Sequence, residues 1–200
     1  MSFVYEIYDD PFWIKEGGVI ETLSALGYFL AALLMIVRGK WAYIKKYHYF
    51  FILVLLFGFR ELDFDKRFTT MGILKSKFYL SSSVPLGEKL IGLFVIAVLL
   101  YIVFSIVKNY YKDFFLNLKK LSSVHIGSLV TFLVLIVSKT LDGLSRKLGD
   151  FGFVMDEQLV SYFEAIEEIL EFGIPLLIIS TLLIYFSSES SNKNSTKHFV

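Results

Sequence analysis

The chain has 200 residues, of which 56% are hydrophobic and 18% aromatic, and its mean hydropathy is +0.63. This composition is too apolar for an ordinary soluble domain and indicates an integral membrane protein. The formal net charge of +1 gives no general attraction to nucleic acid, and the lack of cysteine excludes disulfides, thiol catalysis and thiolate metal sites.

The N-terminal residues 3–14 alternate aromatic and acidic side chains, which is typical of a segment that lies at the membrane interface. This segment is too short and too charged to cross a bilayer. It also lacks a basic region followed by an apolar core, so we expect no cleavable signal peptide. The first membrane span is then expected to act as an uncleaved signal.

Five apolar stretches follow, and a helix needs about 20 residues, at 1.5 Å per residue, to cross roughly 30 Å of hydrocarbon. The predicted spans are residues 18–37, 47–66, 88–107, 124–142 and 164–186. The sequence therefore predicts an all-α polytopic membrane bundle of about five transmembrane helices, with residues 1–186 as a single transmembrane domain. Residues 187–200 are polar and rich in serine and asparagine, which predicts a disordered tail.

The basic residues between the spans predict an orientation in the membrane. Residues 38–46 carry four basic and no acidic side chains, and residues 109–123 carry three lysines against one aspartate. Short basic loops stay in the cytoplasm. We therefore expect the N-terminus outside and the C-terminus in the cytoplasm.

Four carboxylates occupy one face of the fifth predicted span near its start. At about 100° per residue, these positions fall on a stripe roughly 60° wide. They are Glu164, Glu167, Glu168 and Glu171. One face of this helix is therefore acidic, while its other faces are apolar.

Polar residues of the other spans lie at the same depth, when each span is measured from its cytoplasmic end. They are Glu21, Arg60, Glu61, Asp63, Ser138, Lys139 and Asp142. An isolated charge in hydrocarbon costs several kcal/mol, so these groups are expected to face one another. The sequence predicts a polar cavity near the outer leaflet in which acids outnumber bases, so that some carboxyls hold protons or a cation neutralises them.

A metal site is one hypothesis for this cavity. Carboxylates favour Ca²⁺, Mg²⁺ or Mn²⁺ over Zn²⁺, and the three histidines lie elsewhere in the sequence. The candidate divalent-cation ligands are Glu164, Glu167, Glu168, Glu171 and Asp142. No organic cofactor is indicated. In the structural alternative, Glu164, Glu167 and Glu171 are rim charges that pair with Arg60 and Lys139.

Three alternative hypotheses for the function involve the residues of this polar cavity. In the first, the protein is a metal-dependent hydrolase or transferase that acts on a lipid-like substrate, and Glu168, Asp142 and Glu171 are catalytic because they activate water or a hydroxyl. In the second, the carboxylates relay protons or cations in a coupled transporter, although the apolar cytoplasmic halves of the spans offer no continuous path. In the third, the protein is a non-catalytic subunit whose acidic cavity binds another membrane protein.

Overall fold

The computed structural model describes residues 18–197, and for residues 191–197 it describes the backbone only. Every regular element within residues 18–197 is a helix, which confirms the predicted all-α fold. The predicted interfacial segment at residues 3–14 lies outside the described residues.

Five long helices correspond to the five predicted spans. They are α2 (Val19–Lys46), α3 (His48–Glu61), α6 (Leu86–Lys119), α7 (Ser123–Leu141) and α9 (Glu157–Lys197). Three short helices occupy the connections, namely α4 (Phe64–Phe68), α5 (Ser76–Leu80) and α8 (Leu144–Asp150).

Four of the long helices, α2, α6, α7 and α9, are long and apolar enough to cross a membrane. The protein is therefore a multi-pass membrane protein whose environment is a lipid bilayer. Helix α3 has 14 residues and, at 1.5 Å per residue, is about 21 Å long. It ends before the predicted limit of residue 66, and Asp63, just beyond it, has a left-handed φ of 49°.

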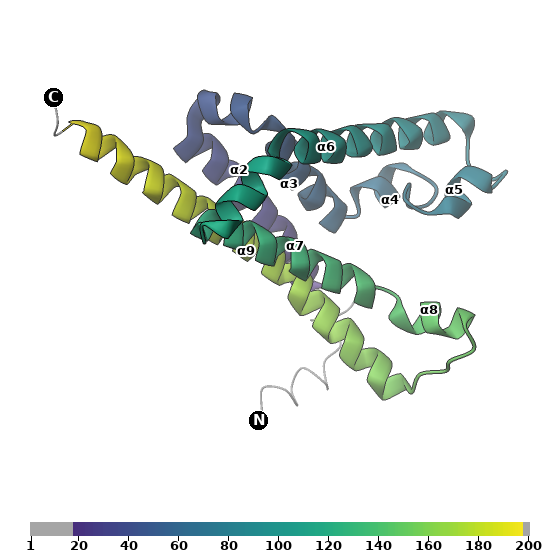
Figure 1. Ribbon diagram of the computed structural model, residues 1–200. Helices are drawn as coiled ribbons and strands as arrows, with labels where there is room; N and C mark the ends of the chain where they lie inside the picture. The colour runs from purple at the N-terminus through teal and green to yellow at the C-terminus, as the bar shows by residue number, and fades with distance from the viewer. Residues whose placement is uncertain (1–17, 198–200) are drawn as a thin grey trace.

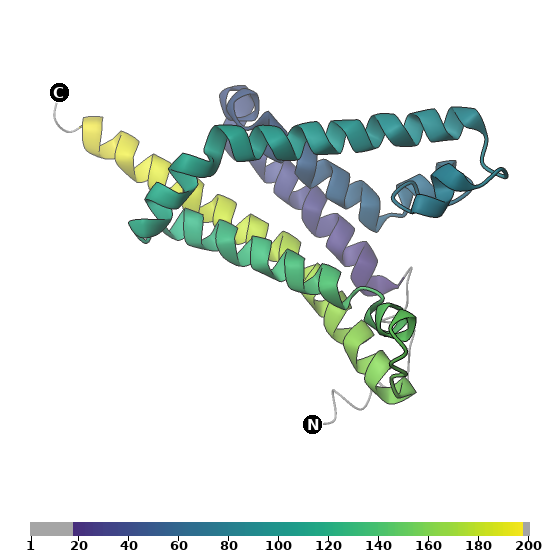
Figure 2. The ribbon, with the colours of Figure 1, turned by 45° about the vertical axis from the view of Figure 1, so that its right-hand side comes forward.

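Helix α2 lies at the centre of the bundle, with α3 against one side and α9 against another, and α7 packs along α9 (Figure 1). Small residues allow the close approach of α2 and α9, as is common between membrane helices. At Gly27, an added Cβ would lie 2.9 Å from the Cβ of Pro175, which is inside α9. Helix α6 runs beside α3 and diverges from α7 and α9 (Figure 2).

The end of α2 bends where a loop was predicted. Lys40 has a φ of 58° and a ψ of −173°, so the helix is interrupted there and residues 41–46 continue it in a new direction. The basic stretch between the first two spans is therefore helical on both sides of a bend.

The connection between α3 and α6 is organised by its own small core of Ile73, Phe78 and Val84. Its polar groups also make local bonds. The carboxylate of Asp65 accepts a hydrogen bond from the backbone N–H of Ile73 at 3.1 Å, and Thr70 donates to Glu88 at the start of α6 at 2.8 Å. This connection is therefore a structured element between α3 and α6.

Helix α9 continues through Lys197, beyond the predicted end of the fifth span at residue 186. The structure thus has helix over most of the stretch for which the sequence predicted a disordered tail. Residues 187–197 contain neither glycine nor proline, and each added residue of a formed helix gains a backbone hydrogen bond. Residues 198–200 lie outside the described part of the chain.

Candidate functional site

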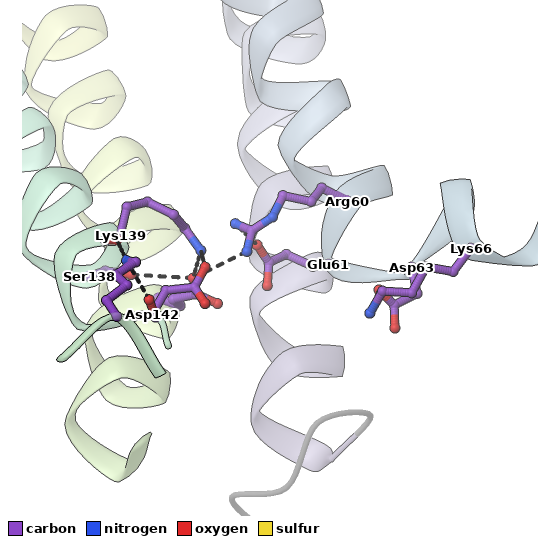
Figure 3. A network of polar contacts seen from close by, with 9 residues as sticks. Arg60, Glu61, Asp63, Lys66, Ser138, Lys139 and Asp142 are labelled. Atoms are coloured by element: carbon purple, nitrogen blue, oxygen red, sulfur yellow. Dashed lines mark hydrogen bonds and ion pairs between the residues drawn. The ribbon is translucent and has the colours of Figure 1, made fainter. Parts of the chain in front are cut away.

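Six polar residues from three helices meet inside the bundle, and we call them the acid–base cluster (Figure 3). They are Arg60, Glu61, Ser138, Lys139, Asp142 and Glu171. The first two lie in the last turn of α3, the next three lie in the last turn of α7 and at its C-cap, and the sixth lies within α9. Two helix ends therefore bring their polar residues to the side of a third helix.

Glu171 is the centre of the acid–base cluster. Its Oε1 atom accepts hydrogen bonds from Nη2 of Arg60 at 3.4 Å, from Oγ of Ser138 at 3.3 Å and from Nζ of Lys139. Only 7% of Glu171 is exposed, and Ser138 is fully buried. One carboxylate oxygen on α9 thus joins α3 and α7 through two cations and a hydroxyl.

Each cation of the cluster also meets a second carboxylate. Nη1 of Arg60 lies 3.3 Å from Oε1 of Glu61, and Nζ of Lys139 lies 3.3 Å from Oδ2 of Asp142. The cluster therefore contains three carboxylates and two cations. Since Glu61 is only 5% exposed, the excess of acid lies partly within the protein.

Lys147 is a member of this region that the sequence analysis missed. Its Nζ donates hydrogen bonds to the backbone carbonyls of Lys139 at 3.3 Å and Asp142 at 2.6 Å. Both carbonyls belong to the end of α7, where the last carbonyl groups of a helix lack helical donors. A lysine a few residues after a predicted helix end is the signal that could have indicated this contact.

Of the predicted site residues, Asp63 lies apart from the acid–base cluster. Asp63 pairs with Lys66 at 2.6 Å, and Figure 3 shows this pair beyond Glu61, away from Lys139. Glu21 is half-buried in the first turn of α2.

The remaining three glutamates of α9 lie toward its N-terminus from Glu171. Glu164 is exposed, while Glu167 and Glu168 are half-buried. No hydrogen bond or ion pair joins any of the three to the described residues. We call Glu164, Glu167 and Glu168 the acidic stripe.

The predicted metal ligands are not gathered around one point. Within residues 18–197, no three or more aspartates, glutamates or histidines form a group that could hold a metal ion. Of the five predicted ligands, Asp142 and Glu171 instead contact the ammonium group of Lys139. The structural alternative agrees with this arrangement in one respect, since Glu171 pairs with both Arg60 and Lys139, but Glu171 is buried and not a rim charge.

Comparison of the chain with protein-family models, with curated proteins and with solved structures finds no match. The function is therefore inferred from the residues themselves.

Proposed function

We propose that the protein is a proton- or cation-coupled membrane transporter in which the acid–base cluster is the coupling site. One observation carries this proposal: a single buried carboxylate oxygen of Glu171 accepts hydrogen bonds from cations of two other helices, Arg60 of α3 and Lys139 of α7. Intramembrane acids and bases that pair with one another are typical of ion and proton pathways.

The coupling follows from the cost of unpaired charge. If Glu171 takes up a proton, Arg60 and Lys139 lose the anion that they share, and each retains only its second carboxylate. A buried charge without a partner is unfavourable by several kcal/mol. The contact of Arg60 with α9 and the packing of α7 against α9 therefore depend on the charge of Glu171, so a change in that charge can favour a second arrangement of the helices.

The acidic stripe supplies the approach to this site. Glu164, Glu167 and Glu168 extend along α9 from Glu171 toward the end of the helix, with the exposed Glu164 outermost. A surface of one sign raises the local concentration of the opposite ion. Cations would therefore collect at the stripe before one reaches Glu171.

The test is flux into sealed vesicles. The purified full-length chain is reconstituted in liposomes that contain a pH-sensitive dye, and proton, sodium and potassium gradients are imposed in turn. We expect the native chain to carry a flux above that of protein-free vesicles, Glu171→Gln to abolish it, and Glu157→Gln, which removes an exposed carboxylate outside the acidic stripe, to retain it. Transport is contradicted if the native chain and empty vesicles give the same rates, or if Glu171→Gln carries native flux.

A metal-dependent hydrolase or transferase that acts on a lipid-like substrate is the second candidate. The observation that favours it is the acidic stripe, whose three carboxylates make no ion pair with the described residues and lie on the face of α9 that leads to Glu171. A divalent cation, with Ca²⁺, Mg²⁺ or Mn²⁺ preferred, would there activate water.

Elemental analysis of the purified protein tests this second candidate. The hydrolase predicts a stoichiometric divalent metal that is lost in Glu168→Ala and kept in Glu157→Ala, which removes a carboxylate from the first turn of the same helix. Absence of metal from the native protein would contradict the metal-dependent hydrolase and would not bear on the transport function.

A further inference from the structure

A cavity of about 520 Å³ lies at the opposite end of the interface between α2 and α9 from the acid–base cluster. Its walls come from residues 38–47 at the bent end of α2 and from residues 185–190 of α9. Ligand pockets in proteins typically measure about 300–1,000 Å³. The cavity is therefore large enough for a small ligand or a lipid headgroup.

The backbone is strained where the cavity forms. Lys40 combines a φ of 58° with a ψ of −173°, a region that residues with side chains rarely adopt. At the preceding Gly39, an added Cβ would lie 2.6 Å from the Cβ of Tyr43. This strained bend turns the end of α2 so that its basic side chains line the cavity, and strain of this kind is often found at ligand sites.

Aromatic rings make the wall rigid. The ring centroid of Tyr43 lies 4.7 Å from that of Tyr47, 5.3 Å from that of Tyr185 and 5.0 Å from that of Phe186. These contacts join α2 to α9. Tyrosine also presents a hydroxyl group that can donate a hydrogen bond to a phosphate.

The position of Lys46 is held by its neighbours. Nζ of Lys46 lies 4.9 Å from the ring centroid of Tyr47. The hydroxyl of Tyr110, on α6, donates to the backbone carbonyl of Lys46 at 2.9 Å and so attaches the end of α2 to a third helix.

The cavity is positively charged. Arg38, Lys40 and Lys46 line it, and Glu189 is the one acidic residue among its lining residues within the described part of the chain. Arginine suits a phosphate because its guanidinium group can donate two parallel hydrogen bonds.

The position in the membrane favours a lipid as the source of the phosphate. Arg38 comes about 20 residues after Val19, so it lies one hydrocarbon thickness from the start of α2. Next to it in sequence, Val37 is 63% exposed, and Trp41 is 78% exposed. Exposed tryptophan beside lysine and arginine is typical of the boundary between acyl chains and headgroups.

We propose that this cavity binds the phosphate headgroup of an anionic phospholipid, held by Arg38 and Lys46, while the acyl chains lie against Val37 and Trp41. Basic pockets between transmembrane helices are a general means of recognising such headgroups. The site is independent of the proposed transport function, since it shares no residue with the acid–base cluster.

The test measures how much lipid the full-length protein retains. Purified protein in detergent is incubated with phosphatidylglycerol or phosphatidylcholine, and native mass spectrometry counts the lipids that remain bound. We expect one phosphatidylglycerol to be retained in preference to phosphatidylcholine. The double variant Arg38→Gln/Lys46→Gln should lower its affinity about 30-fold, which is the effect of two cations near an anionic headgroup.

Two matched variants make the result specific. Lys119→Gln/Lys120→Gln removes two exposed lysines at the C-terminal end of α6 and should leave retention unchanged. Glu189→Gln removes the negative charge of the cavity and should raise the affinity. Equal losses in the two double variants, or no preference for phosphatidylglycerol, would overturn the proposal.

A further arm separates lipid from free phosphate. Inorganic phosphate alone should leave the melting temperature of the delipidated protein unchanged, whereas phosphatidylglycerol should raise it. A rise with inorganic phosphate alone, abolished in Arg38→Gln/Lys46→Gln, would overturn the lipid as the ligand and assign the cavity to free phosphate.

Discussion

At one end of the interface between α2 and α9, a buried carboxylate holds two cations, whereas at the other end aromatic rings pack together and the cations stand exposed around a cavity. Glu171 has only 7% of its surface exposed, and Arg60 and Lys139 converge on one of its oxygens. At the opposite end, Tyr43 contacts three aromatic rings, and the basic side chains lie outside them.

This difference separates two ways of holding membrane helices together. The acid–base end depends on charge, so a proton or a cation can change it. The aromatic end depends on ring packing, whose strength changes little with the charge of neighbouring groups. The cations at this end remain available to an anion from outside the protein. The following variants test this contrast, beginning with the largest expected effect.

Glu171→Ala should cause the largest loss of stability. Removing the shared anion leaves Arg60 and Lys139 with one carboxylate each, and breaking a buried ion pair on one side typically costs about 3 kcal/mol or more. The free energy of unfolding in mixed detergent micelles, followed by circular dichroism, measures the effect. The control Glu164→Ala removes an exposed carboxylate and should change stability by less than about 0.5 kcal/mol. Equal effects of the two variants would contradict a central role for Glu171.

Gly27→Ala should be the next most damaging. The new Cβ would lie 2.9 Å from the Cβ of Pro175, whose ring cannot swing aside, and overpacking of this kind costs about 2 kcal/mol. The same unfolding measurement applies. Gly173→Ala is the control because no heavy atom lies within 4 Å of its added Cβ, so it should be neutral or slightly stabilising. A neutral Gly27→Ala would show that α2 and α9 can separate without loss.

Tyr43→Leu should lower the free energy of unfolding by about 1 kcal/mol, because it removes ring contacts with Tyr47, Tyr185 and Phe186. The loss should be the same at low and high salt, since no charge is involved. Tyr111→Leu, at an exposed tyrosine of α6, is expected to have little effect. A loss that grows or shrinks with salt would remove the proposed distinction between the two ends.

Lys40→Gly should have the smallest effect, and in the opposite direction. Glycine adopts a φ of 58° without strain, although it loses more entropy on folding, so a gain of about 0.5–1 kcal/mol is expected. Lys45→Gly lies within the helical end of α2 and should instead destabilise by about 1 kcal/mol. If both variants destabilise equally, the bend at residue 40 is not a strained position.

The fold class could be predicted from the sequence because length and hydropathy are properties of each segment alone. A helix that crosses a membrane must satisfy its own backbone within the segment, so apolar stretches such as residues 124–142 predict a helix directly. Helix α7, Ser123–Leu141, nearly matches that stretch. The bend at Lys40 could not be predicted in this way, because the single glycine before it, Gly39, does not by itself fix where a helix bends.

The candidate site could be predicted only as a depth in the membrane. Counting residues from each helix end placed Arg60, Lys139 and Glu171 at one level, and the structure brings these three together. The count does not give the rotation of each helix about its axis. It therefore could not distinguish Glu171, which contacts two cations, from Glu168, which makes no ion pair within residues 18–197. Nor could it show that Asp63 pairs with Lys66 instead of joining the cluster.

Pro175 gives α9 a further property that follows from the place of this residue in the chain. The nitrogen of proline carries no hydrogen, so the backbone carbonyl of the residue four positions earlier lacks its helical donor, and that residue is Glu171. Helix α9 can therefore bend at Glu171, whose side chain binds Arg60 of α3 and Lys139 of α7. A bend there breaks no hydrogen bond of the Glu171 carbonyl, because that carbonyl has no helical donor. Helix α2 has its own interruption at Lys40. The two central helices therefore have their mechanical weak points at opposite ends, one beside the acid–base cluster and one beside the basic cavity.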